Sequence, residues 1–373
     1  MDSGVGHERS GSDDLAELMS STSADDVIAS LCALFGDDAE LYAVDHAVTS
    51  LNHYGDADSV PLTGRLRHDV FAGHDHVDDS GVHWIPVLEC DQPVFVVAAE
   101  APVSRSTDQR RAIGSLMGVL RRRFETLERT RRRSSMSVAA ELQWSMLPVR
   151  ADHGSRLAWA ATLEPAYDVA GDLFDYAFDG GLWIYSLDGM GHGLDATTQA
   201  SVALSTIRNV RLDGGSLADQ FAEASRVVRE LTDAYAFVTA LGVHVDTDGW
   251  IEVVDAGHVP LRRVGDDGVV QVDLQVDRPL GVGTDPSYRI SRLEPLTEGE
   301  GLVLLSDGAA SVTTPEGSEL GDETVDRIIA DSWSPIAFET VNEVSAGVMS
   351  HCAGTLSDDL TVVAVRAFGD DDG

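Results

Sequence analysis

Residues 168–196, DVAGDLFDYAFDGGLWIYSLDGMGHGLDA, carry two short acidic motifs, GDLFD and DGMGHG, on either side of an apolar run at 182–187. A short apolar run between turn-forming residues is typical of a buried strand. Asp188 follows this run directly, and glycines at 189, 191 and 193 allow the backbone to turn tightly and to bring a carbonyl oxygen to a ligand. Because Mg2+ and Mn2+ prefer oxygen ligands, the pattern favours a site for a divalent cation.

Acidic residues adjoin strongly apolar, strand-like runs at four places in the chain. They are Asp172 and Asp175 before the run at 182–187, Asp188 after it, Asp307 after LVLLS, and Asp358 and Asp359 before LTVVAV. A single acidic residue at a strand end is more typical of a solvated turn than of a site. Packed within a few Å, however, these carboxylates would repel one another strongly unless cations neutralised them. Two metal ions explain the whole set, because together they can lower the pKa of a shared water and aim it at phosphorus.

Other phosphoryl and nucleotide chemistries need residues that this sequence lacks. All 26 basic residues are arginine, which excludes a Walker A loop, a protein-kinase catalytic lysine and a pyridoxal Schiff base. None of Cys32, Cys90 and Cys352 begins a C-x5-R motif, so a thiol phosphatase is excluded as well. DGMGHG lacks the G-x-G-x-x-G spacing because residue 194 is leucine. The ligand pattern of an EF-hand and a G-x-S-x-G elbow are also missing.

Charge and cysteine content limit the partners and the compartment. The formal net charge of −37 argues against nucleic acid and against an anionic membrane as partners, although it also fits plain solubility or adaptation to salt. The 3 cysteines are far apart and odd in number, which favours a reducing compartment. The sequence shows no N-terminal signal peptide and no apolar run approaching about 18 residues, so we expect a cytoplasmic protein.

The 373 residues are enough for two domains, each with its own core. Residues 1–22 are polar and Gly/Ser-rich and predict a disordered tail. Residues 23–104 combine helical spacing with strand-like runs, and HWIPVLE at 83–89 with PVFVVAAE at 93–100 predicts a hairpin. This order of elements resembles a GAF-type sensor domain of the α+β class. A packing or dimerisation module without a small-molecule ligand is the alternative.

Residues 105–150 predict a linker helix that Pro148 ends. Steps of four and three between apolar residues are typical of a coiled-coil seam, and they occur at Ile113, Met117, Leu120, Phe124 and Leu127. We therefore expect a homodimer through residues 105–127. Apolar spacing resumes out of phase at Ala139, Leu142 and Met146. We interpret this break as a signalling hinge, while a solvated helix face is the alternative for the arginine-rich stretch.

Residues 151–368 alternate strands and helices in an order dominated by hairpins, which argues against a parallel doubly wound sheet. Residues 138–368 resemble the metal-dependent protein phosphatase family (PPM, protein phosphatase 2C-like), in particular its bacterial SpoIIE/RsbU branch. AELQWSMLP resembles the branch's opening helix, DVAGDLFDYAF its G-G-D-x-x-D motif and SLDGMGHGLDA its D-x-x-G-x-G-x-x-A motif. FVTALG, DAGHVPL, RPLGVG, LLSDGA and SDDLTVVAVR follow in the family's order. One departure is Ala170, where glycine is usual.

The resemblance implies the fold and the residues that act. Residues 151–368 would form an α/β sandwich of two antiparallel sheets flanked by helices, and 369–373 an acidic tail. Two Mn2+ or Mg2+ ions would be held by Asp172, Asp188, the Gly189 carbonyl, Asp307 and Asp358. Asp172 and Asp188 would be the catalytic carboxylates, with Asp175 and Asp359 in support. His192 is either a proton donor to the leaving serine oxygen or a structural residue of its turn, and we interpret His258 as structural.

We therefore expect a metal-dependent serine/threonine protein phosphatase regulated through residues 1–147. In this branch the implied phosphoprotein substrate is a phosphorylated STAS-domain anti-sigma-factor antagonist. The alternative is a non-catalytic regulator that keeps the PPM fold and only binds partners. The intact set of acidic residues argues against that alternative.

Overall fold

The computed structural model describes residues 23–36, 38–44, 50–54, 59–62, 64–71, 74–89, 92–100, 109, 112–113, 116–117, 137–166, 171–231, 236–352 and 356–368. The chain divides into two compact units, Met1–Arg133 and Ser134–Gly373. Within the described segments, the helices lack the combination of length and hydrophobicity that crossing a lipid bilayer requires.

The first unit contains one antiparallel sheet of six strands. In spatial order they are β3 (Ser59–Pro61), β2 (Ser50–His53), β1 (Glu40–Val44), β6 (Gln92–Ala99), β5 (His83–Glu89) and β4 (His76–Val77). β5 and β6 form the predicted hairpin, with a register shift between Val87 and Leu88. The same unit also contains the helices α2 (Ala24–Phe35) and α3 (Gly64–Phe71).

Two residues of the predicted coiled-coil seam lie in the core of the first unit. Ile113 and Met117 are only 2% and 1% exposed and pack with side chains of α2 and the sheet. Because they are already covered within one chain, a seam between two chains would have to begin beyond Met117. Leu120, Phe124 and Leu127, like the predicted tails at 1–22 and 369–373, lie outside the described residues.

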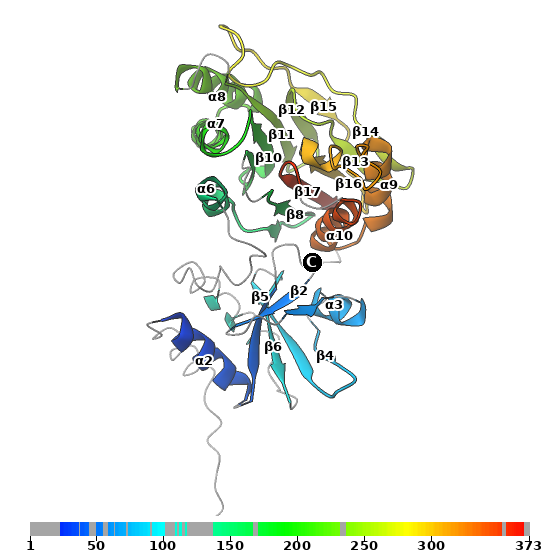
Figure 1. The fold of residues 1–373 in the computed structure, drawn as a ribbon. Helices are drawn as coiled ribbons and strands as arrows, with labels where there is room; N and C mark the ends of the chain where they lie inside the picture. The colour runs from blue at the N-terminus through cyan, green and yellow to red at the C-terminus, as the bar shows by residue number, and fades with distance from the viewer. Residues whose placement is uncertain are drawn as a thin grey trace, which may run out of the picture. The chain divides into compact units, whose positions relative to one another are not determined.

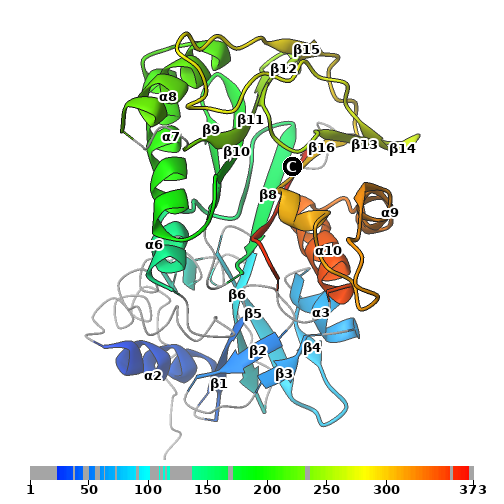
Figure 2. The same ribbon diagram turned by 45° about the horizontal axis from the view of Figure 1, so that its top comes forward.

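The second unit is a sandwich of two antiparallel sheets with helices on its outer faces (Figure 1, Figure 2). The β10 sheet has the order β15 (Ser291–Leu293), β12 (Ile251–Ala256), β11 (Val238–Asp246), β10 (Gly181–Gly189) and β9 (Asp172–Phe178). The β17 sheet has the order β14 (Gly268–Gln271), β13 (Arg262–Gly265), β16 (Gly301–Leu305), β17 (Leu360–Ala367), β8 (Leu157–Glu164) and β7 (Ala151–His153).

Five helices surround this sandwich in the described part of the second unit. α7 (Leu194–Leu212) and α8 (Leu217–Leu231) pack on the β10 sheet, and α10 (Ala337–Ser350) packs on the β17 sheet beside α9 (Asp322–Ser332). α6 (Val138–Met146) begins at Ser137, whose hydroxyl accepts from the amide of Ala140. This segment lies within the linker expected over 105–150 and also resembles the opening helix of the phosphatase branch, and by its contacts it belongs to the second unit.

The apolar run at 182–187 is the buried strand that the sequence predicts. Leu182 and Ile184 lie in the core between the two sheets, whereas Tyr185 and Leu187 pack under α7 and α8. A strand covered on both faces contains apolar residues in succession instead of alternating apolar and polar residues. The packed part of β10 therefore ends next to Asp188 and places this residue at the edge of the sandwich.

Candidate active site

The ends of two neighbouring strands bring Asp172 and Asp188 together. β9 begins with Asp172, which pairs directly with Asp188 near the end of β10. The Gly189 amide donates to the Gly171 carbonyl at 3.1 Å and continues this pairing. Side chains of directly opposed residues in an antiparallel pair are neighbours on one face, and like charges there destabilise the sheet.

Glycine is required at two positions of this turn because backbone atoms from other segments approach the chain closely there. A Cβ on Gly189 would lie 2.3 Å from the Ala196 carbonyl oxygen in α7. A Cβ on Gly171 would lie 3.0 Å from the Gly189 carbonyl oxygen and 3.1 Å from Oδ1 of Asp188. Side chains at these two positions would therefore fill the space beside the carboxylate and displace the start of α7.

The β17 sheet contributes the remaining acidic residues at the same edge. Asp307 follows β16 and opens a short turn, Asp307–Ala309, while Asp358 and Asp359 immediately precede β17. The Thr361 hydroxyl donates to Oδ2 of Asp172 at 2.6 Å and so joins the two sheets. A Cβ on Gly308 would lie 2.0 Å from the Asp359 carbonyl oxygen, so the Asp-Gly pair at 307–308 is also a consequence of tight packing.

The predicted carboxylates perturb one another's ionisation. Burial, followed by the charges of Asp307, Asp358 and Asp359, raises the pKa of Asp188 to about 8. Burial, followed by the charges of Asp188 and Asp359, raises the pKa of Asp172 well above its usual value. Burial also raises the pKa of Asp358 to about 6. These mutual effects are strong only over short distances, so Asp172, Asp188, Asp307 and Asp358 form one acidic edge.

Asp359 supports this edge from within the protein. It is fully buried and accepts hydrogen bonds from the amides of Ala166 at 2.9 Å and Gly171 at 3.2 Å. The Ser306 hydroxyl donates to its carbonyl oxygen at 3.0 Å. Asp359 therefore holds the segment that follows β8 and the start of β9 around Asp172.

Asp175 lies apart from the acidic edge. It is buried under α7, where Nε and Nη2 of Arg208 each donate to its carboxylate at 2.7 Å. Because Asp172 and Asp175 are three residues apart on one strand, their side chains point to opposite faces of the sheet. Asp175 therefore supports the site only through the packing of α7.

The two histidines of the motifs occupy different surroundings. His192 is exposed in the loop before α7, and its charge lowers the pKa of Asp358, which indicates that it lies near the acidic edge. His258 is buried, with its two ring nitrogens 3.0 Å from the hydroxyls of Ser186 and Thr239. These contacts agree with the structural role expected for His258.

One buried residue of the site, Gln143, was missed by the sequence analysis. Its side chain bonds to Asp359 and to the Asp172 backbone. Of the apolar positions Ala139, Leu142 and Met146, Leu142 is 39% exposed, while Ala139 is buried together with Ala140 and Gln143. The polar Gln143 is stable in this buried position because its amide donates to Asp359 and to the Asp172 carbonyl.

The donor atoms of the edge fit a hard divalent cation by charge and type. Carboxylate oxygens and the Gly189 carbonyl are the ligands that Mg2+ and Mn2+ prefer. The raised pKa values of Asp172 and Asp188 indicate that negative charge at this edge is unfavourable without a positive counter-charge. Among the described residues, no group of three or more His, Cys, Asp or Glu is yet close enough to hold a metal ion.

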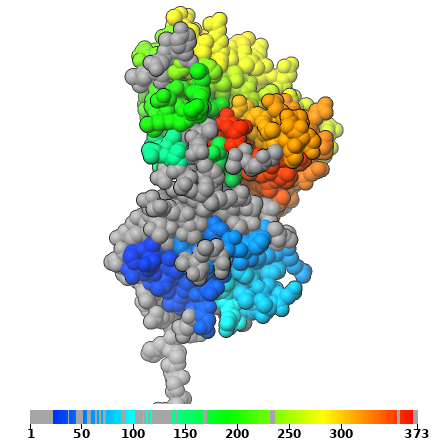
Figure 3. Space-filling view, in the orientation of Figure 1, coloured from blue at the N-terminus to red at the C-terminus, as the bar shows by residue number. Residues whose placement is uncertain are grey.

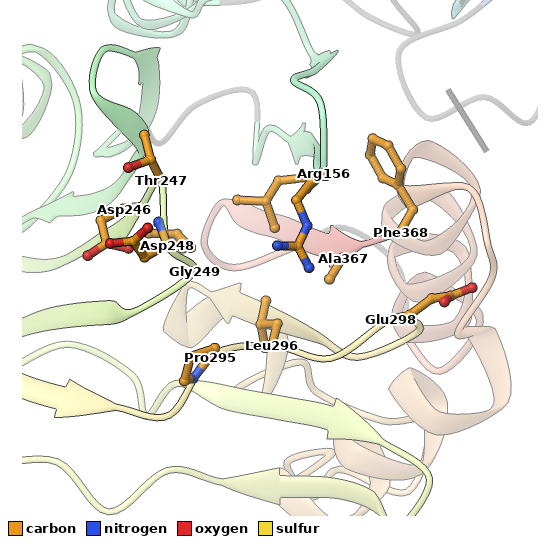
Figure 4. A pocket seen from close by; sticks show the side chains of 12 residues that line it. Arg156, Asp246, Thr247, Asp248, Gly249, Pro295, Leu296, Glu298, Ala367 and Phe368 are labelled. Atoms are coloured by element: carbon orange, nitrogen blue, oxygen red, sulfur yellow. The ribbon is translucent and has the colours of Figure 1, made fainter. Parts of the chain in front are cut away.

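A hollow lies at the edge of the sandwich opposite the acidic residues (Figure 4). Arg156 and Phe368, at the start of β8 and the end of β17, face the turn Asp246–Gly249 between β11 and β12. None of the predicted site residues lines this hollow, so the acidic edge is the candidate site.

Solved structures share the architecture of the second unit. The SiaA-PP2C domain of Pseudomonas aeruginosa matches with a TM-score of 0.50 and 20% identity, over 56% of this chain and 84% of that chain. The RsbU and RsbW domains of a Mycobacterium tuberculosis protein match with a TM-score of 0.50 and 22% identity, over 57% of this chain and 62% of that chain. The second unit thus has the fold of a PP2C-type phosphatase domain.

Sequence comparison identifies the family. The family model for stage II sporulation protein E (SpoIIE) matches residues 179–368, just over half of the chain. The phosphoserine phosphatase RsbU of Bacillus subtilis (strain 168) is 23% identical over 237 residues, which cover 63% of this chain and 70% of RsbU. The chain belongs to the SpoIIE family, and it is an enzyme, a phosphatase.

Proposed function

We propose that the chain is a Mn2+- or Mg2+-dependent serine/threonine protein phosphatase. The acidic edge carries this proposal, because burial and neighbouring carboxylates together raise the pKa values of Asp172, Asp188 and Asp358 at the junction of the two sheets. Such mutual repulsion costs stability, and bound divalent cations would offset it. The name of RsbU, a phosphoserine phosphatase, supports a phosphorylated serine or threonine as the substrate.

In this proposal each residue of the edge has a defined task. Two bound ions would supply a water of lowered pKa and positive charge opposite the phosphoryl oxygens. The residues that would hold the ions are Asp172, Asp188, the Gly189 carbonyl, Asp307 and Asp358. Asp359 keeps the backbone around Asp172 in place through the hydrogen bonds it accepts. His192, exposed near Asp358, donates a proton to the leaving serine oxygen.

The proposed substrate is a phosphorylated STAS-domain anti-sigma-factor antagonist. The resemblance of residues 138–368 to the SpoIIE/RsbU branch, which implies such a substrate, supports it. A net charge of −37 disfavours non-specific binding of other phosphoproteins, which are themselves acidic at the phosphate. Recognition would therefore depend on a complementary docking surface.

Phosphate release from a phosphorylated STAS-domain protein of the host tests this function. We expect release that requires Mn2+ or Mg2+, stops with EDTA and is abolished by Asp188→Asn. Asp248→Asn, which changes an exposed acidic residue at the opposite edge, is the matched control and should leave release unchanged. No release from any phosphoprotein at any Mn2+ concentration would instead favour a non-catalytic regulator that keeps the fold.

We also propose that residues 1–147 regulate the phosphatase unit, with 23–104 acting as a GAF-like sensor or as a dimerisation module. A homodimer would use the part of 105–127 beyond Met117, since Ile113 and Met117 are covered within one chain. Deleting residues 1–104 should change the turnover number without changing which residues are needed for metal binding. Identical kinetics for the truncated and full chains would contradict regulation by this region.

A further inference from the structure

The Gln143 amide is fully buried against the acidic edge. Its Nε2 donates to Oδ2 of Asp359 at 2.6 Å and to the Asp172 carbonyl oxygen at 2.7 Å. A carbonyl oxygen only accepts, and so does an ionised carboxylate, so the amide nitrogen must face both groups. The orientation of the Gln143 side chain is therefore determined by its surroundings, and its oxygen points elsewhere.

That oxygen, Oε1 of Gln143, is buried and has no hydrogen-bond partner among the described residues. A buried acceptor without a donor costs free energy, and buried amides normally have partners for both ends. Gln143 is therefore held by its nitrogen alone, and its two contacts both lead to residues of the acidic edge.

α6 is held beside the site by contacts that do not involve Gln143. The Ser201 hydroxyl of α7 lies 3.1 Å from the sulfur of Met146, at the end of α6. The two helices lie side by side at the surface of the second unit (Figure 1, Figure 3). α7 in turn begins directly after the loop that carries Gly189, against which Ala196 packs. The packing of α6 on α7 thus sets the position from which Gln143 reaches the acidic edge.

We propose that Gln143 is a positioning residue of the phosphatase site. Its Nε2 holds the Asp359 carboxylate and the backbone of Asp172, and so sets the position of Asp172 at the acidic edge. This inference rests on the proposed metal dependence. It makes α6 a part of the site, so that the acidic edge is incomplete without residues ahead of β7.

Mn2+ binding by the full-length chain tests the inference, with free Mn2+ followed by its electron paramagnetic resonance signal. Replacing a residue that orients metal ligands typically weakens metal affinity about 10- to 100-fold, and we expect this for Gln143→Met. The matched control is Gln220→Met. Gln220 in α8 is also fully buried, accepts from the Tyr185 hydroxyl at 2.8 Å and donates to the Gly215 carbonyl at 3.0 Å. Its replacement should leave Mn2+ affinity within about twofold of the wild type.

Two further measurements separate positioning from a merely structural role. Thermal unfolding in EDTA reports whether each variant folds, and Gln143→Asn is a second variant that keeps the polarity but is too short to reach both partners. For either variant, the Mn2+ concentration needed for half-maximal phosphate release should rise, while turnover at saturating Mn2+ recovers. A structural role would lower the melting temperature and leave that concentration unchanged.

The outcomes distinguish this inference from the proposed function. Wild-type protein that binds no Mn2+ would overturn the metal dependence itself, and the inference with it. Wild-type protein that binds Mn2+, together with Gln143→Met and Gln143→Asn variants that bind it as tightly as Gln220→Met, would overturn only the role of Gln143.

Discussion

Replacing Asp188 with asparagine is expected to abolish phosphate release and, in metal-free protein, to increase stability. Burial and the neighbouring carboxylates raise the pKa of Asp188 from 3.8 to about 8. At pH 7 the Asp188 carboxyl is therefore protonated in the folded protein and ionised in the unfolded chain. Because the folded state binds more protons between pH 4 and pH 8, this group makes stability fall as the pH rises through that window.

The magnitude follows from the size of the pKa shift. Each unit corresponds to about 1.4 kcal/mol, so holding Asp188 in the folded state at pH 7 costs up to roughly 4 kcal/mol. At pH 5 the cost falls to about 2 kcal/mol because the unfolded carboxylate is then closer to its own pKa. Asparagine has a similar shape and no charge to bury, so it should recover most of this free energy.

Urea unfolding of the full chain in EDTA, at pH 5 and pH 7, measures this gain. Asp175→Asn is the control with the opposite expected sign, because it weakens the two hydrogen bonds from Arg208 and should destabilise the second unit by about 1–2 kcal/mol. If Asp188→Asn lowers stability in EDTA at pH 7, the acidic edge is not repulsive and the reasoning from its pKa values is wrong.

Three further changes test other parts of the second unit. Burial lowers the pKa of His258 from 6.5 to about 4, so the unfolded chain binds a proton more readily and the protein loses stability as the pH falls below 6.5. In urea unfolding, His258→Gln should therefore reduce the loss of unfolding free energy between pH 7 and pH 4 by about 3 kcal/mol. Gly308→Ala would place a Cβ 2.0 Å from the Asp359 carbonyl oxygen, and the resulting shift of the acidic edge should lower phosphate release about 100-fold while circular dichroism stays unchanged. Arg262 is fully buried and donates to Asp322 at 2.6 Å. In thermal unfolding, Arg262→Met should lower the free energy of unfolding by about 2 kcal/mol. This loss is smaller than that for breaking a fully buried ion pair, because the carboxylates left behind on α9 reach water.

Much of the second unit could be predicted because its motifs are local. Apolar strands ended by Asp-Gly identify Asp188 and Asp307 directly, since only glycine allows the close approach that the structure shows at Gly189 and Gly308. The separation of Asp172 from Asp175 was also predictable, because side chains three residues apart on a strand face opposite ways.

Gln143 could not be predicted in the same way. Gln143 lies within AELQWSMLP, the segment that resembles the branch's opening helix, but this resemblance assigns no role to the amide. Only the tertiary structure brings it to Asp359, which is far away along the chain. The buried positions of Ile113 and Met117 likewise depend on a core formed by distant strands, so a seam and a core look alike in the sequence.

β17 follows every other described strand along the chain, yet it occupies an interior position of its sheet, between β16 and β8. The same segment brings Asp358 and Asp359 to the site. During translation, the ribosome must therefore release the chain through β17 before the sandwich can close, since domains generally fold as units. A nascent chain that has not yet placed this strand can neither complete its hydrophobic layer nor attack a phosphoester, so maturation and hydrolytic competence begin together.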